Sequence, residues 1–354
     1  MKLKKTIVSK NVPNYTINTQ IANTHIMQAG ELAVFEIIEL GKHETAQMID
    51  GRVRSIFPGD HIVAAFADRY ATSQYEGYVP EGPMDIYHII GAGGVIGIVK
   101  SKNYSLKDIE PTTVKLLGYC CDEKGKVINT KFYQKERIKF RGDVKPKVIL
   151  SIGSTMDSGK TTTAAFISRG LAMAKQRVGF IKLTGTCYTR DREFVYDCGA
   201  QIVTDFSDMG FPSTFMCSKE DILDIYQSLI DNLASENLEY IVMEIADGLM
   251  QRETMFLLKD KAFMKTIHKV VFSCGDSLSA FYGVQLLREW GIEVAAVSGR
   301  FTMSPLLITE VHDHIKVPVF TIDEVMTGSQ NHLFGANVIS KPVLLHSYSG
   351  EGDE

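Results

Sequence analysis

A lysine and several threonines follow a loop of small residues near the middle of the chain, and this spacing is suited to binding phosphate groups. The apolar run from Val148 to Ile152 enters the loop, and Gly159, Lys160 and Thr161 open a segment with helical periodicity. Backbone N–H groups of such a loop and of the first helical turn point toward bound phosphate. Lys160 would reach the terminal phosphates, and Thr161 would offer its hydroxyl group to Mg²⁺. The predicted nucleotide-binding residues are Gly153, Ser154, Asp157, Ser158, Gly159, Lys160, Thr161 and Thr162.

The loop departs in one place from the strict phosphate-binding pattern. Ser154 occupies the first glycine position, and Gly153 stands one residue earlier. Gly-Lys-Thr alone is a common tripeptide, so the prediction depends on its context, a strand before the loop and a helix after it.

Three more charged residues stand near the ends of strand-like runs. Lys182 follows an apolar run and could meet a γ-phosphate or an anionic substrate, or it could belong to a solvated loop. Asp205 could hold Mg²⁺ or orient a nucleophile, but an aspartate in such a turn-rich segment is as often a turn or cap residue. Both readings stay open from the sequence.

Glu244 interrupts the apolar run Tyr240–Ile245, and a buried carboxylate needs a metal or a cationic partner. Opposite a phosphate loop it can bind Mg²⁺ directly or through water, and the alternative is a structural pair with a lysine. We therefore predict Lys160, Lys182 and Glu244 as catalytic residues and Thr161, Asp205 and Glu244 as metal ligands.

The elements that must position these residues fall into two parts. Residues 1–145 contain short strand-like runs separated by turn signals, which predicts a small β-rich barrel or sandwich domain. The glycine-rich stretch Gly91–Gly94 leads into a strand rather than a helix, which favours a tight β-turn over a dinucleotide loop.

From residue 146 to 345 strands and helices alternate, and the strand set extends to Val317–Ile322. This order predicts an α/β domain with a mostly parallel P-loop sheet and helices on both faces. Ligands bind at the carboxyl ends of the strands in such sheets. Residues 346–354 are polar and acidic and are predicted to form a frayed tail.

Composition excludes some classes of protein. The 354 residues are 45% hydrophobic and 23% charged, with a net charge of −4, which gives no reason to expect a nucleic acid or an anionic membrane as partner. No apolar run approaches the ~20 residues of a membrane span, and no signal-peptide core follows the basic N-terminus. We expect a cytoplasmic protein. Its six scattered cysteines are expected to be reduced thiols.

Residues 147–323 resemble the dethiobiotin synthetase-like branch of P-loop proteins. The resemblance rests on the loop Gly153–Thr161, the segment Lys182–Gly185, the strand that carries Glu244, and Leu287–Val294 with Val317–Phe320. An uncharacterised P-loop family with an N-terminal β domain is more similar still, through Asp205–Thr214 and Glu244–Thr254.

The resemblance implies an ATP-dependent reaction with Mg²⁺, in which a substrate carboxylate or carbamate is phosphorylated and then attacked. It implies phosphate and Mg²⁺ roles for Lys160 and Thr161, a substrate or phosphate contact for Lys182, and the acidic role for Glu244. The asparagine that these relatives often use to read the base is lacking from Val297–Thr302, so GTP is the alternative to ATP. Related folds also suggest a homodimer.

Two functions follow as hypotheses. The first is an ATP-dependent ligase or phosphotransferase that activates a small carboxylate-bearing metabolite. The alternative is a regulatory or chaperone-like P-loop NTPase whose nucleotide state controls a partner interaction. Turnover distinguishes them, because an enzyme of the first kind releases ADP faster with its small substrate.

Overall fold

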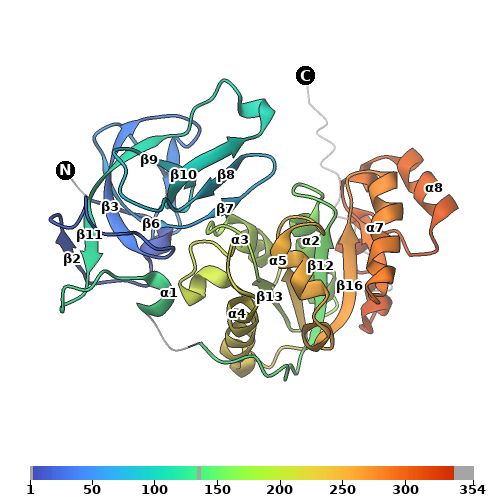
Figure 1. Ribbon diagram of the computed structural model, residues 1–354. Helices are drawn as coiled ribbons and strands as arrows, with labels where there is room; N and C mark the ends of the chain where they lie inside the picture. Colours follow the sequence, from blue (N-terminus) through green and yellow to red (C-terminus); the bar gives the residue numbers. More distant parts are fainter. Residues whose placement is uncertain (1–2, 134–136, 339–354) are drawn as a thin grey trace, which may run out of the picture.

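The computed structural model describes residues 3–133 and 137–338 and arranges them in two parts (Figure 1). The predicted tail, residues 346–354, lies outside the described residues. The first part is built almost entirely from strands, which are β1 (Lys4–Lys5), β2 (Thr16–Asn18), β3 (Leu32–Glu39), β4 (Thr45–Gln47), β5 (Val53–Ser55), β6 (His61–Phe66), β7 (Arg69–Tyr70), β8 (Tyr75–Tyr78), β9 (Tyr87–Gly91), β10 (Val95–Lys102) and β11 (Thr113–Cys121).

Strand pairing in the first part closes into a barrel. β6 pairs with β3, β3 with β11, β11 with β9, β9 with β10, and β10 returns to β6 in parallel. Alternate residues point inward, so the interior is filled by aromatic side chains, among them Phe35, Phe66, Tyr87 and Tyr119. The predicted β-rich unit is therefore confirmed in its barrel form. Gly91–Gly94 forms the tight turn between β9 and β10, as predicted.

The second part contains a six-stranded parallel sheet with the order β14-β13-β15-β12-β16-β17. Its strands are β12 (Lys147–Gly153), β13 (Val178–Lys182), β14 (Ile202–Asp205), β15 (Tyr240–Glu244), β16 (Ile267–Ser273) and β17 (Val294–Ser298). The short helix α1 (Thr130–Tyr133) follows the last strand of the first part. The helices of the second part are α2 (Lys160–Met173), α3 (Arg190–Asp197), α4 (Lys219–Asn232), α5 (Arg252–Leu258), α6 (Lys261–Met264), α7 (Ser277–Glu289), α8 (Pro305–His314) and α9 (Ile322–Met326).

Residues of β12 alternate between the two faces of the sheet. Val148 and Leu150 pack in one apolar cluster with residues of α4 to α7, whereas Ile149 packs in another with residues of α2, α3 and α9. Helices thus cover both faces, and the predicted fold class is confirmed.

Two predictions about strands differ from the structure. Val317–Ile322 is not a strand, because only an isolated parallel bridge joins Val297 to Val319 and Pro318 has no N–H to extend the ladder. β14 was not predicted, since only Ile202 and Val203 of its four residues are apolar.

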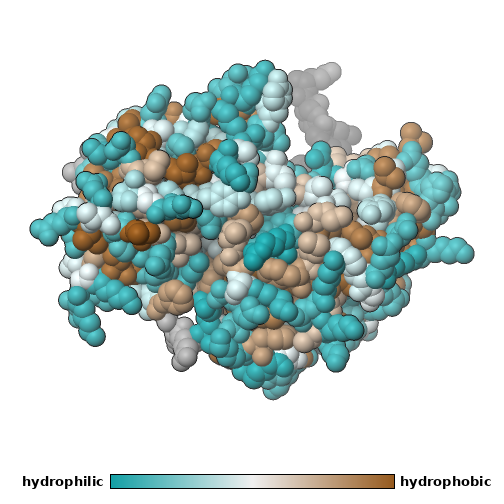
Figure 2. All heavy atoms as spheres, in the orientation of Figure 1, coloured by the Kyte–Doolittle hydropathy of each residue, from teal (hydrophilic) through white to brown (hydrophobic). Residues whose placement is uncertain are grey.

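The two parts pack through a continuous apolar core. One cluster of buried residues runs from Ile7, Ile90 and Val95 in the barrel to Leu183 and Phe211 in the second part. On the face drawn in Figure 2, hydrophobic residues form separate spots among hydrophilic ones. Among residues 3–133 and 137–338, no helix combines the length and apolar character that crossing a bilayer requires.

Candidate nucleotide-binding site

The loop between β12 and α2 folds back tightly on itself. Asp157 and Gly159 have positive φ angles of 62° and 105°. A Cβ atom at Gly153 would lie 2.1 Å from Ser158 Oγ, so this position needs a glycine. The sequence mismatch at Ser154 is thereby explained, because the close approach occurs one residue earlier. Ser154 instead donates its N–H to the carbonyl of Ser273, at 2.9 Å.

Lys160 begins α2 and extends its side chain back along the loop. Its ammonium group donates to the carbonyl oxygen of Thr155 at 2.7 Å, and its side chain is buried. Burial lowers the pKa of Lys160, and the nearby carboxylates of Glu244 and Asp247 oppose this shift. The ammonium group of Lys160 therefore lies against the loop, where phosphate binding requires a positive charge.

Thr161 and Glu244 meet at the carboxyl end of the sheet. Thr161 Oγ1 donates to Glu244 Oε1 at 3.1 Å, and Glu244 is buried at 2% exposure. The second carboxylate oxygen, Oε2, has no hydrogen-bond partner among the described residues, nor does the buried hydroxyl of Ser158. Burying an unsatisfied carboxylate oxygen is costly, so the pair of Thr161 and Glu244 fits Mg²⁺.

These two residues supply part of a ligand set only. No cluster of three or more His, Cys, Asp or Glu side chains suited to a metal occurs within the described ranges. That is compatible with Mg²⁺, which keeps several waters and binds through one or two protein groups and substrate phosphates.

Lys182, at the end of β13, forms an ion pair with Asp191 and lies 3.7 Å from Glu244 Oε1 through its Nζ atom. Burial alone would lower the pKa of Lys182, but Glu244 and Asp191 outweigh it and raise the pKa. Lys182 is therefore charged. Glu244 thus has a lysine neighbour, which the sequence left open as the alternative to Mg²⁺.

A cavity of about 710 Å³ joins these groups, and both parts of the chain line it. Gly159, Lys160, Thr161, Lys182 and Glu244 come from the second part. The predicted residues Asp157 and Thr162 also line it, whereas Gly153, Ser154 and Ser158 form the loop without lining the cavity. From the barrel come Arg69, Tyr70, Ala71 and Gln74.

Asp205 is engaged elsewhere. It caps the 3₁₀-helix Phe206–Met209 by accepting from the backbone N–H of Ser207 at 2.7 Å. Its other carboxylate oxygen lies 3.3 Å from Arg192 Nη1, and the residue does not line the cavity. The contacts of Asp205 are those of a helix cap, which the sequence left open as the alternative to a metal ligand. The metal site that we propose therefore consists of Thr161 and Glu244.

Asp247 and Arg69 are among the residues of the cavity that were not predicted as site residues. Asp247 has a φ of 64°, and burial raises the pKa of its carboxyl group to about 6 despite Lys160, Lys182 and Arg69 nearby. Arg69 is buried, at 8% exposure. The sequence shows Asp247 after a strand and Arg69 in a charged loop, but nothing in it indicates that the two face one cavity.

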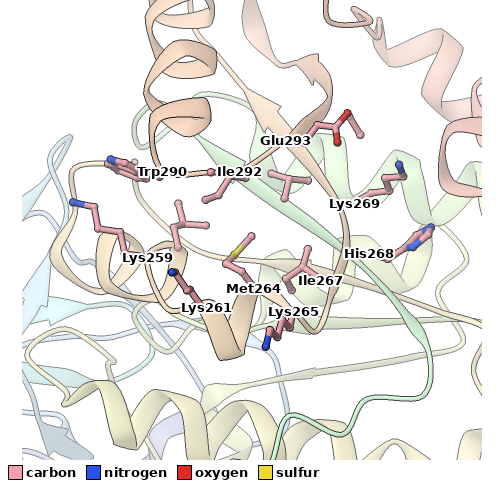
Figure 3. A pocket seen from close by; sticks show the side chains of 14 residues that line it. Lys259, Lys261, Met264, Lys265, Ile267, His268, Lys269, Trp290, Ile292 and Glu293 are labelled. Carbon is pink, nitrogen blue, oxygen red and sulfur yellow. The ribbon is translucent and has the colours of Figure 1, made fainter.

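A second cavity, of about 540 Å³, lies at the opposite edge of the sheet (Figure 3). It borders the amino ends of β16 and β17. Several lysines line it, and Lys259 Nζ lies 4.7 Å from the centre of the Trp290 ring. Because phosphate-binding loops follow the carboxyl ends of strands, this cavity is separate from the candidate site.

No known protein family matches the chain, and no curated protein sequence matches it significantly. Solved structures with partial similarity include those of signal recognition particle proteins. The receptor FtsY from Elizabethkingia anophelis is 16% identical, with a TM-score of 0.34 over 54% of this chain and 66% of that one. Chloroplast FtsY from Physcomitrella patens is 15% identical, with a TM-score of 0.37 over 55% and 65%.

A third structure is the 54 kDa signal recognition particle protein from Aeropyrum pernix K1 in complex with GDP. It is 16% identical, with a TM-score of 0.33 over 56% of this chain and 42% of that one. The chain thus spans less than two thirds of the length of each of these three proteins. At these levels of similarity no activity is carried over to it.

These findings correct the first functional hypothesis. The three structures named above are signal recognition particle proteins, and none of them is a metabolite ligase or kinase. The prediction of an ATP-dependent ligase or phosphotransferase that activates a small carboxylate-bearing metabolite is therefore wrong. The resemblance to the dethiobiotin synthetase-like branch is likewise supported only as far as the P-loop fold. The chain has a P-loop fold, with the phosphate loop at the carboxyl edge of a parallel sheet.

Proposed function

We propose that this protein is a P-loop NTPase whose nucleotide state controls how its barrel part meets a partner. The observation that carries the proposal is the shared lining of one cavity. Arg69, Tyr70, Ala71 and Gln74 of the barrel border the same cavity as Lys160, Thr161 and Glu244. A nucleotide bound by the phosphate loop would therefore lie against the barrel, and loss of its terminal phosphate would change that contact.

The reaction requires only water as acceptor. A water oxygen bonds to the terminal phosphorus while the bond to the bridging oxygen breaks, which yields a nucleoside diphosphate, inorganic phosphate and a proton. Phosphoryl transfer depends mainly on positioning and charge stabilisation. Lys160 and Lys182 supply fixed positive charge, and Thr161 with Glu244 would hold Mg²⁺, which neutralises phosphate charge when bound.

The first experiment measures thermal stability with GTP, GDP, ATP and ADP, each with and without Mg²⁺. Guanine nucleotides are included because two of the similar structures contain GDP. A triphosphate with Mg²⁺ should raise the melting temperature of the wild type and leave Lys160→Ala unchanged. Glu244→Gln should bind with a weaker dependence on Mg²⁺. If no nucleotide stabilises the wild type, the proposal is wrong.

The second experiment measures phosphate release without any other substrate. Slow release that Lys160→Ala abolishes is expected. Release that depends on an added small acceptor would contradict a regulatory NTPase, since a switch needs water alone.

A further inference from the structure

Arg69 is a buried cation at the boundary between the two parts. It lies in β7, which pairs only with β8 and ends the strand order of the barrel sheet. Figure 1 shows β7 on the side of the barrel that faces α3. The side chain is 8% exposed and lines the cavity that also contains Lys160, Lys182 and Asp247.

Within the described part of the chain, the guanidinium group has only neutral hydrogen-bond partners. One terminal nitrogen donates to the carbonyl oxygen of Ile90, and the other donates to Gln74 Oε1 at 2.8 Å. Its buried Nε atom has no partner, and no carboxylate of residues 3–133 and 137–338 forms an ion pair with it. Burial lowers the pKa of Arg69 to about 10, with Asp247 opposing the shift, so the group is charged at neutral pH.

A buried charge without a counter-ion is costly, which indicates that a negative group enters the cavity beside Arg69. The other cations that line the cavity are placed differently, and Arg300 among them is exposed. Lys182 has two carboxylate neighbours, and Lys160 belongs to the phosphate loop. Arg69 is therefore the cation that the barrel contributes to this cavity, and guanidinium groups are suited to phosphate oxygens.

We propose that Arg69 contacts the terminal phosphate of the bound triphosphate, so that the barrel senses the phosphate removed by hydrolysis. This proposal rests on the proposed nucleotide-binding function. It identifies Arg69 as the residue that links nucleotide binding to the barrel. Arg69 also holds Gln74, and Ser73 Oγ lies 3.1 Å from Met156 Sδ in the phosphate loop. A shift of the guanidinium group toward phosphate would therefore change the β7–β8 turn.

The test compares triphosphate and diphosphate affinities by calorimetry, with a non-hydrolysable triphosphate analogue of the base that stabilises the wild type. Arg69→Gln should weaken triphosphate binding about 10–100-fold, as expected for loss of a charged hydrogen bond, and leave diphosphate binding within about twofold. Arg69→Lys should lie between it and the wild type. The matched control is Arg52→Gln, an exposed arginine of the barrel, which should bind both like the wild type.

The outcomes separate the two proposals. If Arg69→Gln binds both nucleotides like the wild type, or loses both equally, Arg69 does not read the terminal phosphate. If the wild type binds no nucleotide, the proposed function itself fails. Lys160→Ala should lose both ligands, which distinguishes a general phosphate contact from a terminal one.

A measurement on the wild type keeps the proposal testable if Arg69 variants do not fold. Hydrogen–deuterium exchange of residues 69–78 should slow with the triphosphate analogue and not with the diphosphate. Equal exchange in the two states would overturn the proposal.

Discussion

At the scale of single residues, the candidate nucleotide-binding site contains buried charged groups whose hydrogen-bonding and ion-pairing needs the protein meets only in part. Among the residues that the structure describes, Glu244 has one oxygen bonded to Thr161 and one oxygen without a partner, and Arg69 has neutral hydrogen-bond partners only. Such groups destabilise the protein unless a ligand completes them. Ligand binding and stability are therefore linked at this site.

Asp247 gives a prediction with a defined pH dependence. Its carboxyl group has a pKa of about 6 in the folded protein against an ordinary value of 3.8, chiefly because it is buried. The folded state holds this proton more tightly than the unfolded state, so the group lowers stability as pH rises from about 4 to 6, and its full cost is present above that range.

Asp247→Asn should therefore raise the melting temperature without nucleotide at pH 7.5, by roughly 2 °C, and the gain should shrink as pH falls below about 5. Thermal melts from pH 4.5 to 8 measure the difference. Asp85→Asn, at an exposed loop residue, is the control and should show no such trend. A gain that grows toward low pH would contradict the assignment.

At the scale of elements, the loop after β15 packs directly on the phosphate loop. A Cβ atom at Gly248 would lie 2.3 Å from the carbonyl oxygen of Ser154, so only glycine permits this contact. Ala246 N also donates to Thr184 Oγ1 at 2.9 Å, which joins the loops after β15 and β13. The loops after β12, β13 and β15, beside which Lys160, Lys182 and Glu244 lie, are thus fixed to one another.

Gly248→Ala should displace the phosphate loop and lower both stability, by about 1–3 kcal/mol, and nucleotide affinity. Denaturant unfolding and nucleotide titration measure the two effects. Gly275→Ala is the matched control, because Gly275 also follows a strand of this sheet but has open space where a Cβ would stand. Equal behaviour of the two variants would show that the contact is not required.

At the scale of the whole molecule, the barrel and the α/β part form one packed unit. A single apolar cluster crosses the boundary, and polar contacts accompany it. Gln47 exchanges two hydrogen bonds with Thr189, at 2.7 and 3.0 Å, and Lys10 pairs with Asp208 at 2.5 Å. We infer that nucleotide signals pass through local changes near β7 rather than through separation of the two parts.

Gly93→Ala tests this packing. A Cβ atom at Gly93, in the β9–β10 turn, would lie 1.9 Å from the carbonyl oxygen of Cys187. The variant should lose about 1–3 kcal/mol and show a broader or split thermal transition, whereas the wild type should unfold in one. Gly82→Ala, a barrel glycine with open space around it, should melt like the wild type. A single unchanged transition in Gly93→Ala would refute the inference of a tight boundary.

The sequence alone determined the phosphate loop, the alternation of strands and helices, and the β-rich first part. These depend on local patterns: hydrophobic periodicity, turn residues, and a lysine at the start of a helix. The sequence could not resolve the roles of Lys182, Asp205 and Glu244. A carboxylate after a strand looks the same whether it meets a metal, a lysine or a backbone cap.

The tertiary structure decided which of these groups come together. It brought Glu244 to Thr161 and Lys182, placed Asp205 on a cap beside Arg192, and brought Arg69 of the barrel into the same cavity as Lys160. The physical reason is that segments far apart in the chain bury these side chains and supply their hydrogen-bond and ion-pair partners. The sequence contains the charged residues, and only the packing of the two parts determines which charges face one cavity.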